Sequence, residues 1–257
     1  MDNKDFWEQQ AKKHKDNVCA VNFDSMEEDL EFFFLDQLVS DGIKVCDIGC
    51  GNGRTILELA RKKKNTFFYG VDFSPNMIEI ANQQKEKFNL KNVNFQVADA
   101  ISKDILNIVP QVDVVLSKRL LINIEDENRH KAIENIYSLL VDKGEYIMVE
   151  CFLEPLNRIN EIRKQLKLSE IKTKTFNQYL ESDFLQLEQM KKRFTIKRTL
   201  DFESSYYYMS RIYNAYLSDG EPDYFSTINQ LSVHLTKKGF TIVDGYGPEQ
   251  IIILEKK

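Results

Sequence analysis

Five short apolar runs, separated by segments of helical periodicity, occupy residues 43–152 of this chain. The runs cover residues 43–48, 66–72, 93–97, 112–116 and 146–151, and helical patterns cover residues 55–62, 74–88 and 128–140. Strands that alternate with helices run in the same direction, because each helix carries the chain back to the edge where the previous strand began. The alternation therefore predicts an α/β fold with a doubly wound parallel sheet that helices cover on both faces.

The pattern changes after residue 152. Residues 154–168 and 226–238 have helical periodicity, and residues 193–208 read as extended. The chain closes with two apolar runs, residues 239–243 and 250–254, which we expect to be the sixth and seventh strands. A short turn joins them and permits only antiparallel pairing. We therefore expect a sheet of about seven strands with an antiparallel terminal strand, and an insertion between the fifth and sixth strands.

The composition fits a folded domain and narrows the class of partner. Of 257 residues, 42% are hydrophobic and 11% aromatic, which is enough for a sizeable core. The net charge of −5, with acids and bases interspersed, argues against a nucleic-acid partner, because such binding needs a basic face. A signal-peptide core and a run of ~20 apolar residues are both missing from the sequence, so we expect no membrane insertion.

The four cysteines, Cys19, Cys46, Cys50 and Cys151, lack the spacing of a metal site, and we expect no metal. They fit as reduced thiols, two of them small buried residues at a strand end, and so favour the cytoplasm. We expect a monomer or a homodimer.

The strongest local signal is Asp47-Ile48-Gly49-Cys50-Gly51-Asn52-Gly53, directly after the first predicted strand. Alternate glycines let the backbone turn sharply and lie against a ligand. A dinucleotide fingerprint places its third glycine at position 54, where this chain has Arg54. The Asp47 carboxylate would repel a pyrophosphate but complements ammonium and sulfonium charges. The loop therefore favours S-adenosylmethionine (SAM) over NAD.

Two further acids follow the next two predicted strands. Asp72 lies ~20 residues beyond the glycine loop, where a ribose-binding acid belongs, and can accept from both ribose hydroxyls. Asp99 can accept from the adenine amino group, and apolar walls can come from Phe73, Met77 and Ala100. Each acid alone is also explained as a turn or helix cap. Acids at the ends of three successive strands, beside a glycine loop, predict a nucleoside site.

Residues 44–150 resemble the class I SAM-dependent methyltransferase family in these motifs. The resemblance implies a Rossmann-like fold, with methionine at the glycine loop, ribose at Asp72 and adenine at Asp99. We also expect an N-terminal lid, in which Trp7 and Lys13 cover SAM, although Trp7 could instead pack an exposed helix on the body. The predicted cofactor residues are Trp7, Lys13, Asp47, Gly49, Cys50, Gly51, Asp72, Phe73, Met77, Asp99, Ala100 and Ser117.

A narrower resemblance rests on residues 6–14, 117–123, 150, 160–163 and 176–179. These segments are similar to a bacterial subfamily of small-molecule O-methyltransferases found among surface-polysaccharide biosynthesis enzymes. Lys118 and Phe176 stand where the subfamily pattern has Glu and a Trp-His pair. The resemblance implies methyl transfer to a small polar acceptor: a sugar, phosphorylated or carboxylated metabolite of surface-glycan biosynthesis.

On the acceptor side, Arg119 follows the fourth predicted strand and can bind a carboxylate or phosphate with its forked donors. It could instead form a structural bridge to Glu150, which ends the fifth strand. The predicted acceptor residues are Arg119, Asn123, Asn160, Arg163, Asn177, Tyr179, Tyr207 and Arg211. Tyr207 belongs to a run of tyrosines that is also ordinary for a strand. The predicted catalytic residues are His14 and Glu150 as bases and Arg119.

The expected division is therefore an N-terminal helical lid (1–40), a SAM-binding core (41–152), an acceptor-binding insertion (153–225) and a C-terminal helix with a strand pair (226–257). Three alternatives remain. A non-catalytic SAM-binding regulator would lack an acceptor pocket. A nucleic-acid amino methylase would carry an Asn/Asp-Pro-Pro-aromatic motif where this chain has Ser117-Lys118-Arg119-Leu120, although RNA and protein methyltransferases of other kinds stay open. An NAD-dependent oxidoreductase is disfavoured by Asp47 and Arg54.

Overall fold

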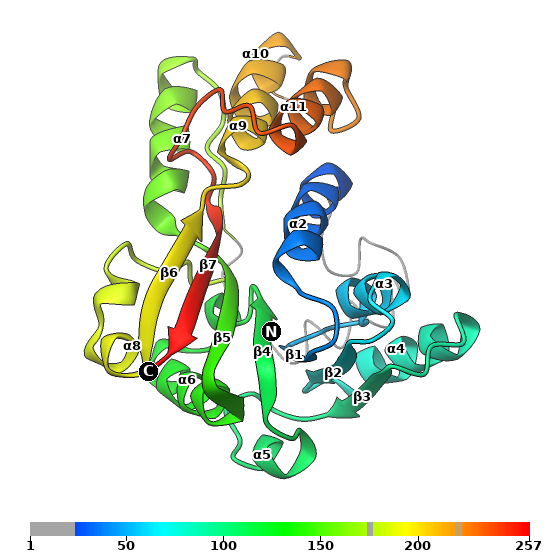
Figure 1. Cartoon of the computed structure of the whole chain (residues 1–257). Coiled ribbons are helices and arrows are strands. Elements are labelled where there is room, and N and C mark those ends of the chain that lie inside the picture. Colours follow the sequence, from blue (N-terminus) through cyan, green and yellow to red (C-terminus); the bar gives the residue numbers. More distant parts are fainter. Residues whose placement is uncertain (1–23, 174–176, 219, 221–222) are drawn as a thin grey trace.

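A seven-stranded sheet forms the centre of the molecule (Figure 1). The computed structural model describes residues 24–173, 177–218, 220 and 223–257. The strands are β1 (Lys44–Ile48), β2 (Phe67–Asp72), β3 (Val93–Val97), β4 (Val112–Lys118), β5 (Leu140–Cys151), β6 (Phe194–Leu200) and β7 (Glu249–Lys256). Their order is β3-β2-β1-β4-β5-β7-β6; β1 to β5 are parallel, and β7 pairs antiparallel with both β5 and β6. The predicted Rossmann-like α/β fold is confirmed.

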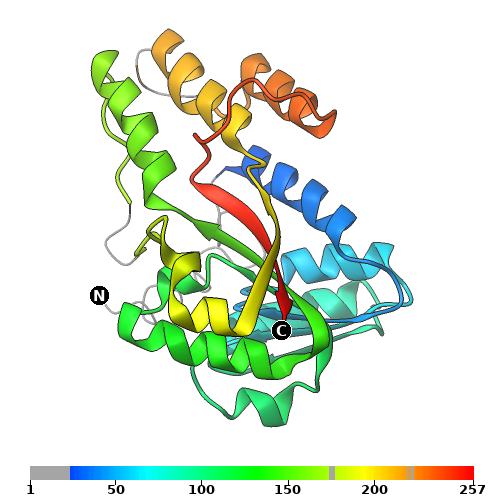
Figure 2. The ribbon, with the colours of Figure 1, turned by 60° about the vertical axis from the view of Figure 1, so that its left-hand side comes forward.

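Helices cover both faces of this sheet (Figures 1 and 2). On one face lie α2 (Ser25–Leu38), α3 (Arg54–Lys62) and α4 (Pro75–Lys87). On the other lie α5 (Ile105–Ile108), α6 (Asp126–Leu139) and α8 (Glu188–Arg193). Beyond the carboxyl ends of the parallel strands lie α7 (Leu153–Gln165), α9 (Ser204–Tyr208), a π-helical stretch (Met209–Asn214), α10 (Ala215–Leu217) and α11 (Thr227–Lys237).

The central strands are apolar on both faces, as a sheet covered by helices on each side requires. Successive side chains of a strand point to opposite faces. In β5, Tyr146 and Met148 join the core beneath α6, whereas Ile147 and Val149 join the core beneath α2 and α3. This two-sided burial explains why the sequence shows continuous apolar runs.

The predicted sixth strand is wrong. Residues 239–243 form no strand, and Phe240 and Ile242 are 63% and 46% exposed. The amide of Ile242 donates to Ser205 Oγ at 2.8 Å, so α9 holds this segment in place of a strand ladder. The sixth strand is β6, inside the segment predicted as an insertion. The insertion is therefore split, one part lying between β5 and β6 and the other between β6 and β7.

Tyr207 was also expected in an extended segment, and that expectation is wrong. The strand ends at Leu200, and residues 204–208 form α9, whose tyrosines pack among helices. Tyrosine is an ordinary β-former, but tertiary packing overrides such a preference.

The N-terminal side of the molecule is described from Asp24 onward. The Asp24 carboxylate caps α2 by accepting from the amides of Met26 and Glu27 at 3.1 and 3.2 Å. Trp7, Lys13 and His14 lie outside the described residues, so the N-terminal lid stays a prediction. Within the described ranges no helix combines the length and apolar character that crossing a membrane requires.

Candidate functional site

The glycine loop leaves β1 and turns directly into α3. The amides of Gly49 and Cys50 both donate to the carbonyl of Val71 at 2.8 and 3.0 Å, which ties the loop to the end of β2. Gly53 has φ +75°, and a Cβ there would lie 2.6 Å from the Phe95 ring. Only glycine therefore lets the loop lie this close to the sheet.

Asp72 organises the same region. Its Oδ2 accepts from the amide of Gly51 and its Oδ1 from the amide of Ser74, both at 2.9 Å. The carboxylate thus joins the glycine loop to the start of α4, where Ser74 caps the helix and Pro75 occupies its first turn. Asp99, at the end of the next strand, accepts from the amide of Ile101 at 3.1 Å.

Asp47 is the most unusual group of the site. It is 2% exposed, and its Oδ1 has no hydrogen-bond partner among the described residues. Burial raises the pKa of Asp47 to about 7; Lys118 opposes this rise, and Asp72 and Glu31 add to it. A buried, unpaired carboxyl oxygen is costly unless a ligand supplies the donor. An ammonium group is such a donor.

Two adjoining cavities run along these residues. One, of about 150 Å³, is bordered by Asp47, Gly49, Cys50, Gly51, Asp72, Phe73, Met77, Arg119, Asn123 and Asn177, among others. The other, of about 360 Å³, is bordered by Asp99, Ala100, Ile101 and Asn128, among others. They share Gly49, Phe73, Leu120 and Asn123. The structure thus brings together nine of the predicted cofactor residues: Asp47, Gly49, Cys50, Gly51, Asp72, Phe73, Met77, Asp99 and Ala100.

Ser117 does not join them. It is fully buried in β4, and its hydroxyl is 2.7 Å from Tyr146 Oη, inside the core beneath α6. Cys50 borders the first cavity as a neutral thiol, because burial raises its pKa well above the ordinary value.

Arg119 has a left-handed backbone conformation, with φ +50°, that residues other than glycine seldom adopt. Its amide donates to the carbonyl of Val149 at 2.8 Å, and its side chain crosses to two other elements. The Nη1 atom donates to Glu31 Oε2 at 2.8 Å and also to Glu249 Oε2. Arg119 therefore forms a structural bridge to Glu31 of α2 and Glu249 of β7, and the expected bridge to Glu150 is wrong.

Glu150, the predicted base, borders neither of the two cavities. It is fully buried; Oε1 accepts from the amide of Leu121 at 2.7 Å and Oε2 from that of Ile122 at 3.4 Å. Burial raises its pKa to about 7, although these amides oppose the rise. Its contacts hold the turn that follows β4, which places Arg119 and Asn123.

A family model described as a methyltransferase domain matches residues 39–206 of the chain. The chain belongs to this methyltransferase family. The predicted cofactor, SAM, agrees with this family. In fold, the chain is similar to a TehB-like SAM-dependent methyltransferase from Corynebacterium glutamicum, which aligns over 98% of both chains. That alignment has a TM-score of 0.56 and 17% identity, so it establishes the fold alone.

Curated relatives of the methyltransferase differ in their reactions. The carboxy-S-adenosyl-L-methionine synthase of Nautilia profundicola is 28% identical over 166 residues, which are 60% of this chain and 67% of that protein. The human tRNA N(3)-cytidine methyltransferase METTL6 is 30% identical over 100 residues, 38% of this chain and 35% of that protein. The chain spans about half the length of several other curated relatives that it matches.

The predicted acceptor residues of the methyltransferase differ in what their side chains contact. Asn123 and Asn177 border the first cavity. Asn160 and Arg163 instead bind backbone, Asn160 Nδ2 donating to the carbonyl of Ile171 at 3.0 Å and Arg163 Nε to that of Ser169 at 2.7 Å. These two contacts fold the loop after α7, and they leave the predicted acceptor role of the pair without support.

Tyr207 and Arg211 contact each other. The Arg211 guanidinium lies 4.8 Å from the Tyr207 ring centre and 4.6 Å from that of Tyr224, and its Nη2 donates to Asp24 Oδ2 at 2.7 Å. Tyr179 is half-buried and packs on the core beneath α6. The insertion therefore meets the start of α2 through an arginine held between two aromatic rings.

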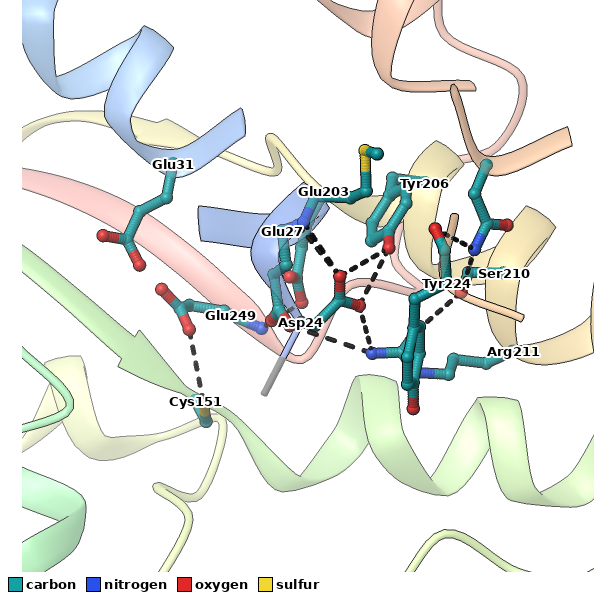
Figure 3. A network of polar contacts seen from close by, with 12 residues as sticks. Asp24, Glu27, Glu31, Cys151, Glu203, Tyr206, Ser210, Arg211, Tyr224 and Glu249 are labelled. Atoms are coloured by element: carbon teal, nitrogen blue, oxygen red, sulfur yellow. Dashed lines mark hydrogen bonds and ion pairs between the residues drawn. The ribbon is translucent and has the colours of Figure 1, made fainter. Parts of the chain in front are cut away.

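Sequence reasoning missed the carboxyl groups on this side of the site. Asp24 and Glu27 lie at the start of α2, Glu31 one turn later, and Glu203 and Glu249 on the segments that meet them; Figure 3 shows the five together. A signal was present: Asp24, Glu27 and Glu31 recur at three- and four-residue spacing, and acids at this spacing share one face of a helix.

Proposed function

We propose that this chain is a SAM-dependent methyltransferase acting on a small polar acceptor. The observation that carries the proposal is the buried Asp47 oxygen, unpaired among the described residues and bordering a cavity next to the glycine loop and Asp72. SAM when bound supplies an activated methyl group, and its ammonium is the donor that this oxygen lacks.

The residues of the two cavities have separate tasks in this proposal. Asp72 accepts from the ribose hydroxyls while holding Gly51 in place. Asp99 and Ala100 border the second cavity, where adenine fits between Phe73 and the turn after β4. Arg119 and Asn123 stand at the first cavity and line the place of the acceptor. Alignment of the acceptor atom with the methyl group is then the main catalytic contribution of the protein.

The charge around Arg119 restricts the acceptor further. Its Nη1 is bound by the carboxylates of Glu31 and Glu249, so its positive charge is already compensated. Of the three predicted acceptors, this favours the uncharged sugar over a phosphorylated or carboxylated metabolite, and it also permits a cationic acceptor. O-methylation within surface-glycan biosynthesis, in the cytoplasm, stays a prediction from the sequence resemblance.

The experiment is an assay of S-adenosylhomocysteine release with the purified chain, SAM and panels of sugars, sugar phosphates, hydroxy acids and amines. We expect turnover with at least one small acceptor, and Asp72→Ala should raise the KM for SAM. Asp36→Ala is the control, because Asp36 pairs with Lys62 and Lys63 and borders neither cavity. Binding of SAM without turnover of any small acceptor, but with turnover of tRNA or protein, would replace the small-molecule proposal. Binding without any turnover would favour the SAM-binding regulator.

A further inference from the structure

Five carboxyl groups gather beside the cofactor cavity, between α2, β7 and the start of α9 (Figure 3). Asp24, Glu31, Glu203 and Glu249 are buried, and the Glu27 side chain is 13% exposed. The cluster begins at the cavity wall, because Arg119 borders the cavity and binds Glu31 and Glu249 behind it.

Two carboxyl oxygens in this cluster, Glu203 Oε2 and Glu249 Oε1, accept from no N–H or hydroxyl group of the described residues. Their polar neighbours are other carboxyl groups, Glu27 beside Glu203 and Glu31 beside Glu249. Glu203 is fully buried and Glu249 is 1% exposed. The second oxygen of each is used by the fold: Glu203 Oε1 accepts from the amide of Glu249 at 2.7 Å, and Glu249 Oε2 accepts from Arg119. A buried carboxyl oxygen that lacks a hydrogen-bond donor is costly, so these two oxygens indicate a missing donor.

The neighbouring cations do not meet this need. Lys118 binds Glu31, and Arg119 binds Glu31 and Glu249. Arg211 binds Asp24 and lies 3.8 Å from Glu27. In the part of the chain that the structure describes, three cations therefore face these five carboxyl groups. Burial raises the pKa of Glu27, and it raises the pKa of Glu203 and Glu249 well above the usual range, so without a further cation Glu203 and Glu249 favour their protonated forms.

We propose that the methyl acceptor is an amine, an ammonium ion in solution, whose nitrogen binds between Glu203 and Glu249 next to Arg119. This rests on the proposed methyltransferase function. The ammonium donates to Glu203 Oε2 and Glu249 Oε1, and its charge replaces the protons that the cluster otherwise holds. An anion would meet carboxyl oxygens there, and a neutral hydroxyl would leave the excess of carboxyl groups uncompensated.

Methyl transfer to the bound amine begins with the loss of one proton. The bound ammonium gives one proton to the Glu249 or Glu203 carboxylate, which frees the nitrogen lone pair. The nitrogen–methyl bond forms as the sulfur–methyl bond breaks, giving S-adenosylhomocysteine and a methylated ammonium product. The carboxyl group then releases its proton to solvent.

Binding and turnover of matched acceptors test this proposal. Glucosamine, glucose and glucuronate form one set; phenethylamine, phenethyl alcohol and phenylpropionate form another. With S-adenosylhomocysteine bound, calorimetry of the amines in two buffers of different ionisation enthalpy should show proton release. With SAM, an amine should exceed its alcohol and acid counterparts at least tenfold in kcat/KM.

Glu249→Gln and Glu203→Gln provide the residue-level test, with Glu255→Gln, on the same strand but paired to surface lysines, as the control. The two variants should raise the KM for the amine at least tenfold and abolish proton release, with unchanged affinity for S-adenosylhomocysteine. Should either variant fail to fold, the wild-type proton release still decides.

Turnover of the alcohol or acid but not of the amine, or amine binding without proton release, would overturn the amine proposal while leaving the methyltransferase function intact. No affinity for SAM would instead remove the function on which the proposal rests.

Discussion

The Glu31 carboxylate forms a buried ion-pair network, because its side chain is 1% exposed and binds two cations. Its Oε1 accepts from Lys118 Nζ and its Oε2 from Arg119 Nη1. Burial alone would raise the pKa of Glu31, but Lys118 and Arg119 outweigh it and bring the pKa from an ordinary 4.5 to about 2. Glu31→Gln keeps the shape and removes the charge.

The contribution of the ionised Glu31 carboxylate to folding follows from its pKa in the unfolded and in the folded chain. At ~1.4 kcal/mol for each pH unit between 4.5 and about 2, the ionised carboxylate contributes about 3 kcal/mol to folding. Removing one partner of a buried ion pair costs a similar ~3–5 kcal/mol, since the other charges stay buried. Because the folded-state pKa is lowered, this contribution is complete above pH 4.5 and is lost as the pH falls toward 2.

Urea unfolding followed by far-ultraviolet circular dichroism measures the effect. At pH 7 we expect Glu31→Gln to lower the free energy of unfolding by about 3 kcal/mol, with the difference from wild type narrowing below about pH 4. Glu58→Gln, whose 38% exposed side chain pairs with Arg54 on one helix, serves as control and should change it by less than about 0.5 kcal/mol. Equal midpoints for wild type and Glu31→Gln would refute the buried-charge reasoning.

Two further outcomes follow from the cofactor side. The pKa of Asp47 is raised to about 7, and a cationic ligand binds its ionised form, so SAM affinity should fall from pH 8 to pH 6. Fluorescence titration of Asp47→Asn should give weaker binding without that slope; a slope kept in the variant would assign it elsewhere. Gly53→Ala meets the Phe95 ring at 2.6 Å in a left-handed backbone and should lose about 3 kcal/mol of stability. Gly42→Ala, with φ +85° and open space around it, should lose only about 1 kcal/mol, and equal thermal shifts would rule out the clash.

The cofactor side of the site could be predicted because its signals are local. Asp47, Asp72 and Asp99 each end a strand, and parallel strands bring their carboxyl ends to one edge of the sheet. The glycine loop supplies its own turn. These three acids could therefore be predicted to lie close together although they are far apart in the sequence.

The acceptor side depends on contacts that no local pattern encodes. Arg119 meets Glu31 and Glu249, which are 88 and 130 residues away in the sequence. The apolar run at residues 239–243 resembled a strand, but β6 occupies the edge position beside β7. Strand pairing across such distances is decided by the whole sheet, and an apolar run without a partner remains a loop.

The most direct measurement of the central claim is calorimetric titration of the purified chain with SAM and, separately, with NAD. We predict one SAM bound per chain, no NAD binding, and at least ~10-fold weaker SAM binding by Asp72→Ala, as loss of a charge-assisted hydrogen bond of about 1.5–3 kcal/mol requires. Binding of NAD in place of SAM, or SAM affinity unaltered in Asp72→Ala, would contradict the account.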